Sequence, residues 1–359
     1  MMQFLGAAAA AAAKHTNEDV VSEKNYDRAA PVSGGDGEVH VLMFALDYKR
    51  TSNPLTCTMD AKNMKTLCAA CGIADVTIML DEQCTKENVL RAIAEVGGRC
   101  EEDDYFVIYY SGHGTSVKDE DGDEDDGKDE AFCFVLEDGS ITADSLMTDD
   151  EFSAAVTEAT EETVRCLILT DCCHSGTIAD LDADCWQGRE AISITGCLDS
   201  QTSGDMGKGG IFTHAMLLAV DQLQDAGQED YSVGMLFNAT LEKDQKVFSS
   251  AQDITIQSTV SVTPDKMAWP LVPTSMNYKA PLTQAASQSA GGAEVSAAQV
   301  NLGALNPQML ASLGIKPNLL QYVNQAGLQE GEIDIGKILK AGTAAWMAGD
   351  CTKDSCAIS

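Results

Sequence analysis

Residues 104–114 read DYFVIYYSGHG, an unbroken apolar run that gives way abruptly to small and polar residues. An apolar run of this length, without polar alternation, is typical of a strand buried on both faces of a sheet. Residues 164–176, VRCLILTDCCHSG, repeat the same form. Two such strands predict a parallel sheet, and the polar residues that follow them would meet at its carboxyl edge, where open α/β sheets place their reactive groups.

The other segments complete an α/β pattern. Further strands are expected at 39–46, 76–80, 191–195 and 254–260, and residues 132–136 are expected to form one arm of a hairpin. Helices are expected near 59–72, 85–97, 149–158, 212–224 and 232–247. Because strands alternate with helices, the pattern predicts a mostly parallel central sheet with helices on both faces.

The charge of the chain limits its partners. The 359 residues include 23 Lys and Arg against 56 Asp and Glu, which gives a formal net charge of −33. A polyanion of this kind repels nucleic acids and anionic membrane surfaces, so neither is expected as a partner. It suits basic peptides or divalent cations held by carboxylate oxygens.

The cysteines and the apolar runs indicate the cellular compartment in which the protein is expected. Thirteen cysteines at irregular spacing, with no evident signal peptide, favour a reducing compartment over a disulfide scaffold. No apolar run reaches the length of a transmembrane segment. A cytoplasmic location is therefore expected.

His113 and Cys173 form a candidate catalytic pair, because they follow the two strands whose carboxyl ends should meet. Attack on an amide needs a thiolate and later a proton donor for the leaving amine, and one imidazole supplies both. Gly112 and Gly114 would let the chain turn sharply beside the ring, and backbone N–H groups near Cys173 and Gly114 could hold the oxyanion.

The two motifs YSGHG and DCCHSG resemble those of the metacaspases, over roughly residues 38–270. His113 and Cys173 are 60 positions apart, which is also close to the spacing of about 50 seen in caspases. The resemblance implies a caspase-like (caspase-hemoglobinase) fold and a thiol protease with Cys173 as nucleophile and His113 as base. It further implies a monomer that acts by proteolysis, in the family's setting of programmed cell death. Cys172 is expected to pack inward.

The resemblance also implies a substrate pocket. Residues 56–61, TCTMDA, look like the Cys-x-x-Asp-Ala stretch of metacaspases. By the same likeness, the S1 pocket is lined by Cys57, Asp60, Ser111 and Asp171. Two carboxylates in a narrow slot would select Arg or Lys through charge-assisted hydrogen bonds. The simpler alternatives are a helix-start residue for Asp60 and a turn cap for Asp171.

Calcium is the expected activator. The acid-rich run 119–130 does not fit an EF-hand loop, because its sixth residue counted from Asp121 is not Gly, so the default interpretation is a solvated loop. Metacaspases commonly need calcium, and the resemblance assigns it to four aspartates: Asp129, Asp149, Asp150 and Asp180. Asp149 has a simpler alternative role as a helix N-cap.

We expect three parts in the chain: a flexible N-terminal tail at 1–37, a peptidase domain at 38–275, and a low-complexity linker and extension at 276–359. The resemblance divides the domain into a large-subunit-like part, 38–185, and a small-subunit-like part, 190–275, as in type I metacaspases but without an evident Pro-rich or zinc-finger prodomain. Self-cleavage at Arg189 or Lys208 stays open. The final residues CAIS match a prenylation box at Cys356.

Two other functions compete with this interpretation. One is a catalytically weak caspase-fold scaffold or calcium-sensing binding protein, against which the intact Cys173 and His113 argue. The other is a caspase-like preference for Asp, which the acids at 60 and 171 oppose because they would repel an anionic side chain.

Overall fold

The computed structural model describes residues 37–118, 128–173, 176–197, 204–250, 252–274 and 278–284. They build a six-stranded sheet in the order β2-β1-β3-β7-β8-β9. The first five of these strands run parallel to their neighbours, and β9 is antiparallel to β8. Their bounds are Val39–Ala45 (β1), Asp75–Leu80 (β2), Tyr105–Ser111 (β3), Arg165–Asp171 (β7), Ala191–Thr195 (β8) and Thr255–Ser258 (β9). The predicted α/β class with a mostly parallel sheet is confirmed.

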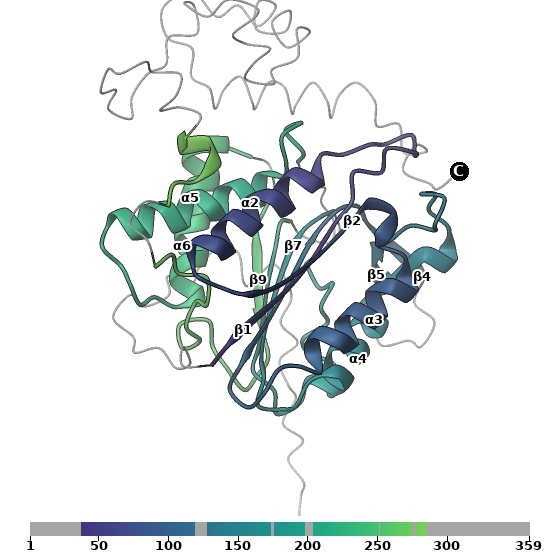
Figure 1. Ribbon diagram of the computed structural model, residues 1–359, viewed down its shortest axis with the longest axis horizontal. Helices are drawn as coiled ribbons and strands as arrows, with labels where there is room; N and C mark the ends of the chain where they lie inside the picture. Colours follow the sequence, from purple (N-terminus) through teal and green to yellow (C-terminus); the bar gives the residue numbers. More distant parts are fainter. Residues whose placement is uncertain are drawn as a thin grey trace, which may run out of the picture.

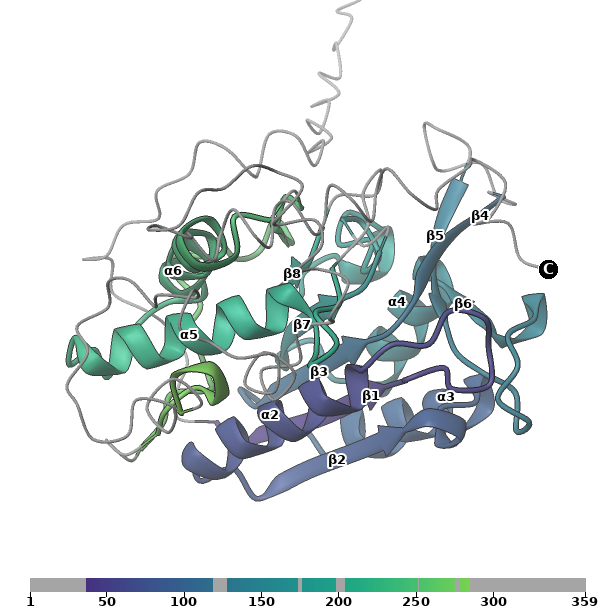
Figure 2. The same ribbon diagram turned by 90° about the horizontal axis from the view of Figure 1, so that it is seen from above.

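Helices cover both faces of the sheet, as Figures 1 and 2 show. The helices are α2 (Cys57–Ala70), α3 (Lys86–Gly97), α4 (Asp149–Ala159), α5 (Ile211–Asp225) and α6 (Val233–Lys243). α2, α5 and α6 pack on one face, and α3 and α4 pack on the other, with a hydrophobic core on each side. A π-helical turn, Asp244–Phe248, continues α6.

Local sequence explains where these elements lie. Tyr105–Ser111 is buried at every position, which is why it reads as a continuous apolar run rather than an alternating one. α3, α4 and α6 each begin at a hydroxyl residue whose side chain accepts a backbone N–H of the first turn: Thr85, Thr148 and Ser232. At α4, Glu151 completes a capping box with Thr148.

A second, three-stranded antiparallel sheet lies beside the α4 side of the molecule. It contains β4 (Gly114–Lys118), β5 (Lys128–Cys133) and β6 (Leu146–Thr148). The expected hairpin arm thus exists, but its strand spans 128–133 instead of 132–136. β4 and β6 were not predicted from the sequence, since both are short and β4 is mostly polar. β4 starts at the residue after His113 and carries the chain away from the central sheet.

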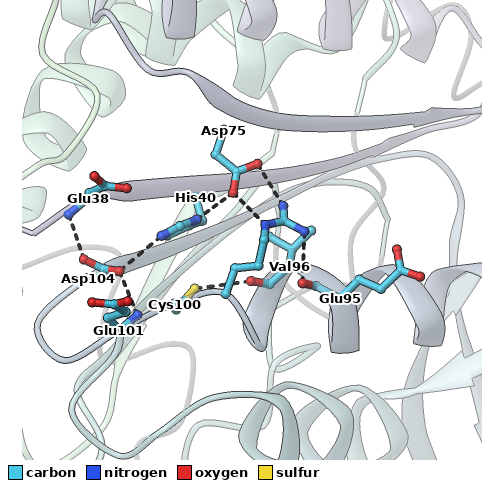
Figure 3. A network of polar contacts seen from close by, with 9 residues as sticks. Glu38, His40, Asp75, Glu95, Val96, Cys100, Glu101 and Asp104 are labelled. Carbon is cyan, nitrogen blue, oxygen red and sulfur yellow. Dashed lines mark hydrogen bonds and ion pairs between the residues drawn. The ribbon is translucent and has the colours of Figure 1, made fainter.

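The amino ends of β1, β2 and β3 are tied together by a buried histidine, shown in Figure 3. His40 Nδ1 lies 2.7 Å from Asp75 Oδ2, and His40 Nε2 lies 3.1 Å from Asp104 Oδ2. Arg99 holds the other oxygen of Asp75 at 2.8 Å. This network occupies the end of the sheet opposite the edge where the sequence predicts the site.

Residues 278–284 pack against α5, beyond the predicted domain boundary at 275. Lys279 Nζ lies 3.0 Å from Asp221 Oδ1, and both Ala280 N–H and Thr283 Oγ1 donate to Asp221 Oδ2. Of the helices in the described ranges, none combines the length and the apolar character that crossing a bilayer requires.

Candidate active site

The two motifs meet at the carboxyl ends of neighbouring strands. β3 and β7 are paired in parallel so that Ser111 lies opposite Asp171, and Gly112 N–H donates to Asp171 O at 3.3 Å. A Cβ atom at Gly114 would lie only 1.9 Å from the carbonyl oxygen of Cys173, so no side chain fits there. The chain around His113 is therefore in backbone contact with the chain at Cys173.

Cys172 and Cys173 differ in exposure. Cys172 is fully buried, and its carbonyl accepts from the Cys197 thiol at 3.2 Å, whereas Cys173 is half-buried. Burial raises the pKa of the Cys172 thiol well above its ordinary value. A buried thiol with a raised pKa is a poor nucleophile, so Cys173 is the member of the pair suited to react.

The His113 ring is held from two sides. Its Nε2 lies 2.8 Å from the carbonyl oxygen of Asn53, and the Tyr48 ring lies against it with a centroid distance of 4.3 Å. Because a carbonyl only accepts, Nε2 carries a proton, and Nδ1 is the basic nitrogen of the neutral ring. Burial lowers the pKa of His113, although the bond to Asn53 and the Asp205 charge oppose this. A neutral imidazole is the form that can accept a thiol proton.

A buried pair of carboxylates lies beside these motifs. Asp60 on α2 and Asp171 at the end of β7 are 0% and 4% exposed. Asp60 accepts from Ser111 Oγ at 2.9 Å and from Gly210 N–H at 3.0 Å. Asp171 accepts from the N–H and the hydroxyl of Thr213 at 2.9 and 2.8 Å. The pair thus joins four elements at one point.

Asp60 and Asp171 are two acidic groups close together in a buried environment with little access to water. Burial raises the pKa of Asp60 well above its ordinary value, and the Asp171 carboxylate raises it further. Burial likewise raises the pKa of the Cys57 thiol, with Asp60 adding to the effect and Ser111 opposing it. Cys57, Asp60, Ser111 and Asp171 therefore lie close enough to act on one another, and their role as a substrate pocket stays a prediction. A cation placed between the carboxylates would relieve their repulsion.

Some residues of this region were not assigned a role from the sequence. Asp205 accepts from the N–H and the hydroxyl of Thr56, each at 2.7 Å, and so fastens the segment before α5 to the start of α2. Thr213, Asn53 and Tyr48 also contact the site. These residues lie far from the two motifs in the sequence, and no local pattern distinguishes them.

Three of the four predicted calcium ligands come together. Asp129 on β5 and Asp149 and Asp150 at the start of α4 have carboxylate oxygens within 4.8 Å of one another. Asp129 and Asp149 are 5% and 3% exposed. Burial raises the pKa of Asp149 to about 8, and the neighbouring carboxylates of Glu130 and Asp150 add to the rise. Converging buried carboxylates fit a hard cation with oxygen ligands, such as Ca²⁺.

Asp180, the fourth predicted ligand, is not a member of this carboxylate group. It lies in a turn after Cys173 with a φ of 34°, in the left-handed region. The neighbouring Glu130, which the sequence analysis did not assign, connects the two regions: it accepts from Thr177 Oγ1 at 2.8 Å, and its N–H donates to Asp149. The N-cap of α4 is Thr148, so Asp149 does not act as the helix N-cap, which was the simpler alternative for it.

Several predictions concern residues that the structure does not describe. Most of the acid-rich run, residues 119–127, lies outside the described ranges, as do His174 and Ser175. The same holds for residues 1–36 of the predicted tail and for residues 285–359, which include Cys356.

The comparison with known families agrees with these motifs. Residues 40–182 match the family model described as "Metacaspase, peptidase C14 domain". This match runs from β1 to just beyond Cys173, and so contains the described parts of the site except the segment that leads into α5.

Individual relatives carry the same name. Metacaspase-2 of Arabidopsis thaliana is 28% identical over 59% of this chain and 58% of its own length. Metacaspase-1 of the same plant is 34% identical over 34% of this chain and 38% of its own. The chain thus covers less than two thirds of either relative. Among solved structures, caspase-1 from Spodoptera frugiperda is 14% identical with a TM-score of 0.45, over 69% of this chain and 96% of that one.

The family match, the curated relatives and the two motifs at the joined ends of β3 and β7 all identify the same group of proteins. Residues 40–182 of this chain are similar to the metacaspase peptidase C14 domain, and the curated relatives that the chain matches are metacaspases.

Proposed function

We propose that the chain is a cysteine endopeptidase that cuts after Arg or Lys, with Cys173 as nucleophile and His113 as base. The observation that carries the proposal is the position of a buried carboxylate pair beside the joined chain segments of His113 and Cys173. A nucleophile, a base and an acidic pocket then adjoin one another at the carboxyl edge of the sheet.

The first half of the reaction forms a thioester. His113 Nδ1 accepts the thiol proton, and the Cys173 sulfur attacks the carbonyl carbon of the scissile peptide bond. The C=O π electrons move to oxygen, and backbone N–H groups near Cys173 and Gly114 stabilise that oxyanion. As the oxyanion collapses, the C–N bond breaks, and the His113 imidazolium gives its proton to the leaving amine.

The second half releases the acid product. The imidazole, neutral again, takes a proton from water as the water oxygen attacks the thioester carbon. The C–S bond breaks, the carboxylic acid leaves, and the proton returns to the sulfur. The Asn53 carbonyl stabilises the imidazolium in both halves, because it accepts from Nε2 while Nδ1 takes up and gives off the proton.

Selectivity for Arg or Lys rests on Asp60 and Asp171, with Cys57 and Ser111 around them. A guanidinium or ammonium group is the partner that two buried carboxylates favour most, since it removes their mutual repulsion and donates several hydrogen bonds. The same pair disfavours Asp in the substrate, which opposes a caspase-like preference.

Calcium is proposed as activator, held by Asp129, Asp149 and Asp150, with Asp180 as a further candidate ligand. When bound, the ion would supply positive charge that offsets the repulsion among these carboxylates. Through Glu130, Thr177 and Asp149, the carboxylate group is linked to the turn that follows Cys173. We also propose a cytoplasmic monomer that acts on protein substrates.

The direct test is hydrolysis of an Arg-ended fluorogenic peptide by the wild type and by Cys173→Ala, each with calcium or with a chelator. Calcium-dependent cleavage that the variant loses supports the nucleophile, the specificity and the activator together. Cleavage that needs no calcium would remove the activator from the proposal. A correctly folded wild type without activity in any condition would favour the scaffold alternative.

A further inference from the structure

Two buried phenols enclose the backbone of the proposed base. Tyr48 and Tyr110 are 3% and 1% exposed, and their hydroxyl oxygens lie 2.9 Å apart. Tyr48 follows β1 and Tyr110 belongs to β3, so the pair links two strands of the sheet beneath His113.

The hydrogen bonds of this pair converge on the main chain of His113. The N–H of His113 donates to Tyr48 Oη at 2.9 Å, and Tyr110 Oη donates to the carbonyl oxygen of His113 at 2.6 Å. Tyr48 in turn donates to the carbonyl oxygen of Cys133 at 2.6 Å. Each phenol has a single proton, and both protons are thus directed at backbone carbonyls next to the site. Both peptide groups of His113 are fixed by a side chain.

The neighbouring chain is shaped to admit these phenols. A Cβ at Gly112 would lie 2.5 Å from Tyr110 Oη and 2.6 Å from Tyr48 Oη, so a side chain there would displace them. On the other side of His113, the backbone at Gly114 already touches the Cys173 carbonyl. A shift of the His113 backbone toward the phenols or away from them would therefore change its distance from the nucleophile.

Tyr48 also reaches the imidazole itself. Its ring lies 4.3 Å from the His113 ring, centroid to centroid, at an angle of 38°. Tyr48 has a φ of 50°, in the left-handed region that bulky residues seldom adopt, and its carbonyl accepts from the N–H and the hydroxyl of Thr51, each at 3.0 Å. A strained conformation held by a local turn indicates that the direction of this side chain matters.

We infer that Tyr48 and Tyr110 form a phenol clamp that positions His113 against Cys173, as positioning residues for the reaction. The inference rests on the proposed function. It assigns no chemistry to the phenols: their task is to hold the base at the distance and angle that proton transfer requires. Neither phenol is hydrogen-bonded to the acid pocket, so the clamp should affect the chemical step and leave substrate binding alone.

The test compares Tyr48→Phe and Tyr110→Phe, which remove one oxygen each and keep the rings. Tyr105→Phe is the matched control: Tyr105 is another buried tyrosine on β3, and its hydroxyl has no hydrogen-bond partner among the residues that the structure describes. With an Arg-ended peptide, we expect kcat to fall about tenfold to a hundredfold in each clamp variant while KM stays within about twofold. The double variant should lose little more than the worse single one, because both phenols act through His113.

A second readout needs no peptide hydrolysis. The rate at which iodoacetamide alkylates Cys173, followed against pH by mass spectrometry of the tryptic peptide, reports whether His113 activates the thiol. This rate should fall near neutral pH in both clamp variants, as in His113→Ala, and stay at the wild-type level in Tyr105→Phe. If the wild type cuts no peptide, the proposed function fails while the alkylation profile still decides on the clamp.

Wild-type kcat and alkylation profiles in both clamp variants would overturn the inference. So would an equal loss in the Tyr105→Phe control, since that would indicate a general effect on the core. A rise in KM with unchanged kcat would assign the phenols to substrate binding instead.

Discussion

At the scale of single residues, the acid pocket depends on two carboxylates that repel one another. Asp60→Asn keeps the size of the side chain and removes one charge. We expect kcat/KM for an Arg-ended peptide to fall about tenfold to a hundredfold, the loss of one charge-assisted hydrogen bond of about 1.5–3 kcal/mol. The melting temperature should rise, because the buried repulsion with Asp171 is relieved.

The control for this variant is Asp138→Asn, an exposed carboxylate that accepts from Ser140 and lies away from the pocket. Unchanged kcat/KM in Asp60→Asn, with the peptide otherwise cleaved normally, would remove Asp60 from the pocket. Asp171→Asn should behave as Asp60→Asn does.

The raised pKa of Asp60 also predicts how binding depends on pH. Arg is best bound by the ionised carboxylate, which takes up a proton as the pH falls through that raised pKa. The KM for an Arg-ended peptide should therefore increase on acidification, already at a pH well above the range where an ordinary Asp titrates. The measurement is KM against pH for the wild type and for Asp60→Asn, in which this dependence should be lost. A parallel dependence in both proteins would assign the titration to another group.

At the scale of elements, the start of α4 and the start of β5 form the candidate calcium site. Adding CaCl₂ to chelator-treated protein should raise the melting temperature, because an ion that binds only the folded state stabilises it. At a hundred times the dissociation constant the gain is about 2.7 kcal/mol, or several degrees for a domain of this size. Asp149→Asn should abolish the shift.

The matched control is Asp144→Asn, since Asp144 lies in the turn before β6 and outside the carboxylate group. An equal shift in the wild type and in Asp149→Asn would exclude these residues as ligands. Mg²⁺ provides a second comparison, because its stricter octahedral geometry suits a cluster of carboxylates less well.

The helices and strands also show how much of the fold could be predicted from the sequence. The strands and helices of the central sheet could be predicted, because buried parallel strands read as apolar runs and the helices begin at capping residues such as Thr85 and Thr148. β4 and β6 could not, since strands this short owe their pairing to their neighbours rather than to their own sequence. The strand expected at 132–136 was shifted for the same reason.

For the candidate site, too, only some of the residues could be predicted from the sequence. His113 and Cys173 could be placed together because the ends of parallel strands share an edge. The pocket residues came from a resemblance to a family, and their roles stay predictions. Asn53, Asp205 and Thr213 were missed, because their contacts with the site join segments as much as about 150 residues apart that carry no motif of their own. Asp180 is not among the three aspartates whose oxygens lie within 4.8 Å of one another, and its role as a ligand stays a prediction.

At the scale of the whole molecule, we expect the amino and carboxyl ends of the central sheet to have separate roles, one in stability and the other in activity. His40 ties the amino ends of three strands, while the candidate site lies at their carboxyl ends. His40→Gln should lower the free energy of unfolding by about 2–3 kcal/mol, because the His40 ring contacts the buried Asp104 carboxylate and one oxygen of Asp75, which then keeps only Arg99. The kcat and KM of the remaining folded protein should be unchanged. Denaturant titration and peptide kinetics on the same sample measure both, and a loss of kcat in folded protein would contradict this separation.

The same network predicts a stability limit in acid. Burial alone would raise the pKa of Asp104, but backbone N–H groups of Glu101 and Glu38, together with His40, lower it below its ordinary value. Arg99, followed by His40, lowers that of Asp75 in spite of burial. A lowered folded-state pKa contributes stability above the unfolded pKa of about 3.9 that is lost as the pH falls through the folded value. In urea titrations, His40→Gln should therefore lose less stability than the wild type between about pH 5 and pH 2.

The most direct measurement of the central claim compares two peptides that differ at a single group. One ends in Arg before the fluorophore, and the other ends in citrulline, which has nearly the same shape without the charge. We predict that the wild type with calcium cleaves the Arg peptide at least about a hundredfold more efficiently, since two buried carboxylates require a cation, and that Cys173→Ala cleaves neither. Equal cleavage of the two peptides, or cleavage that persists in Cys173→Ala, would contradict the account.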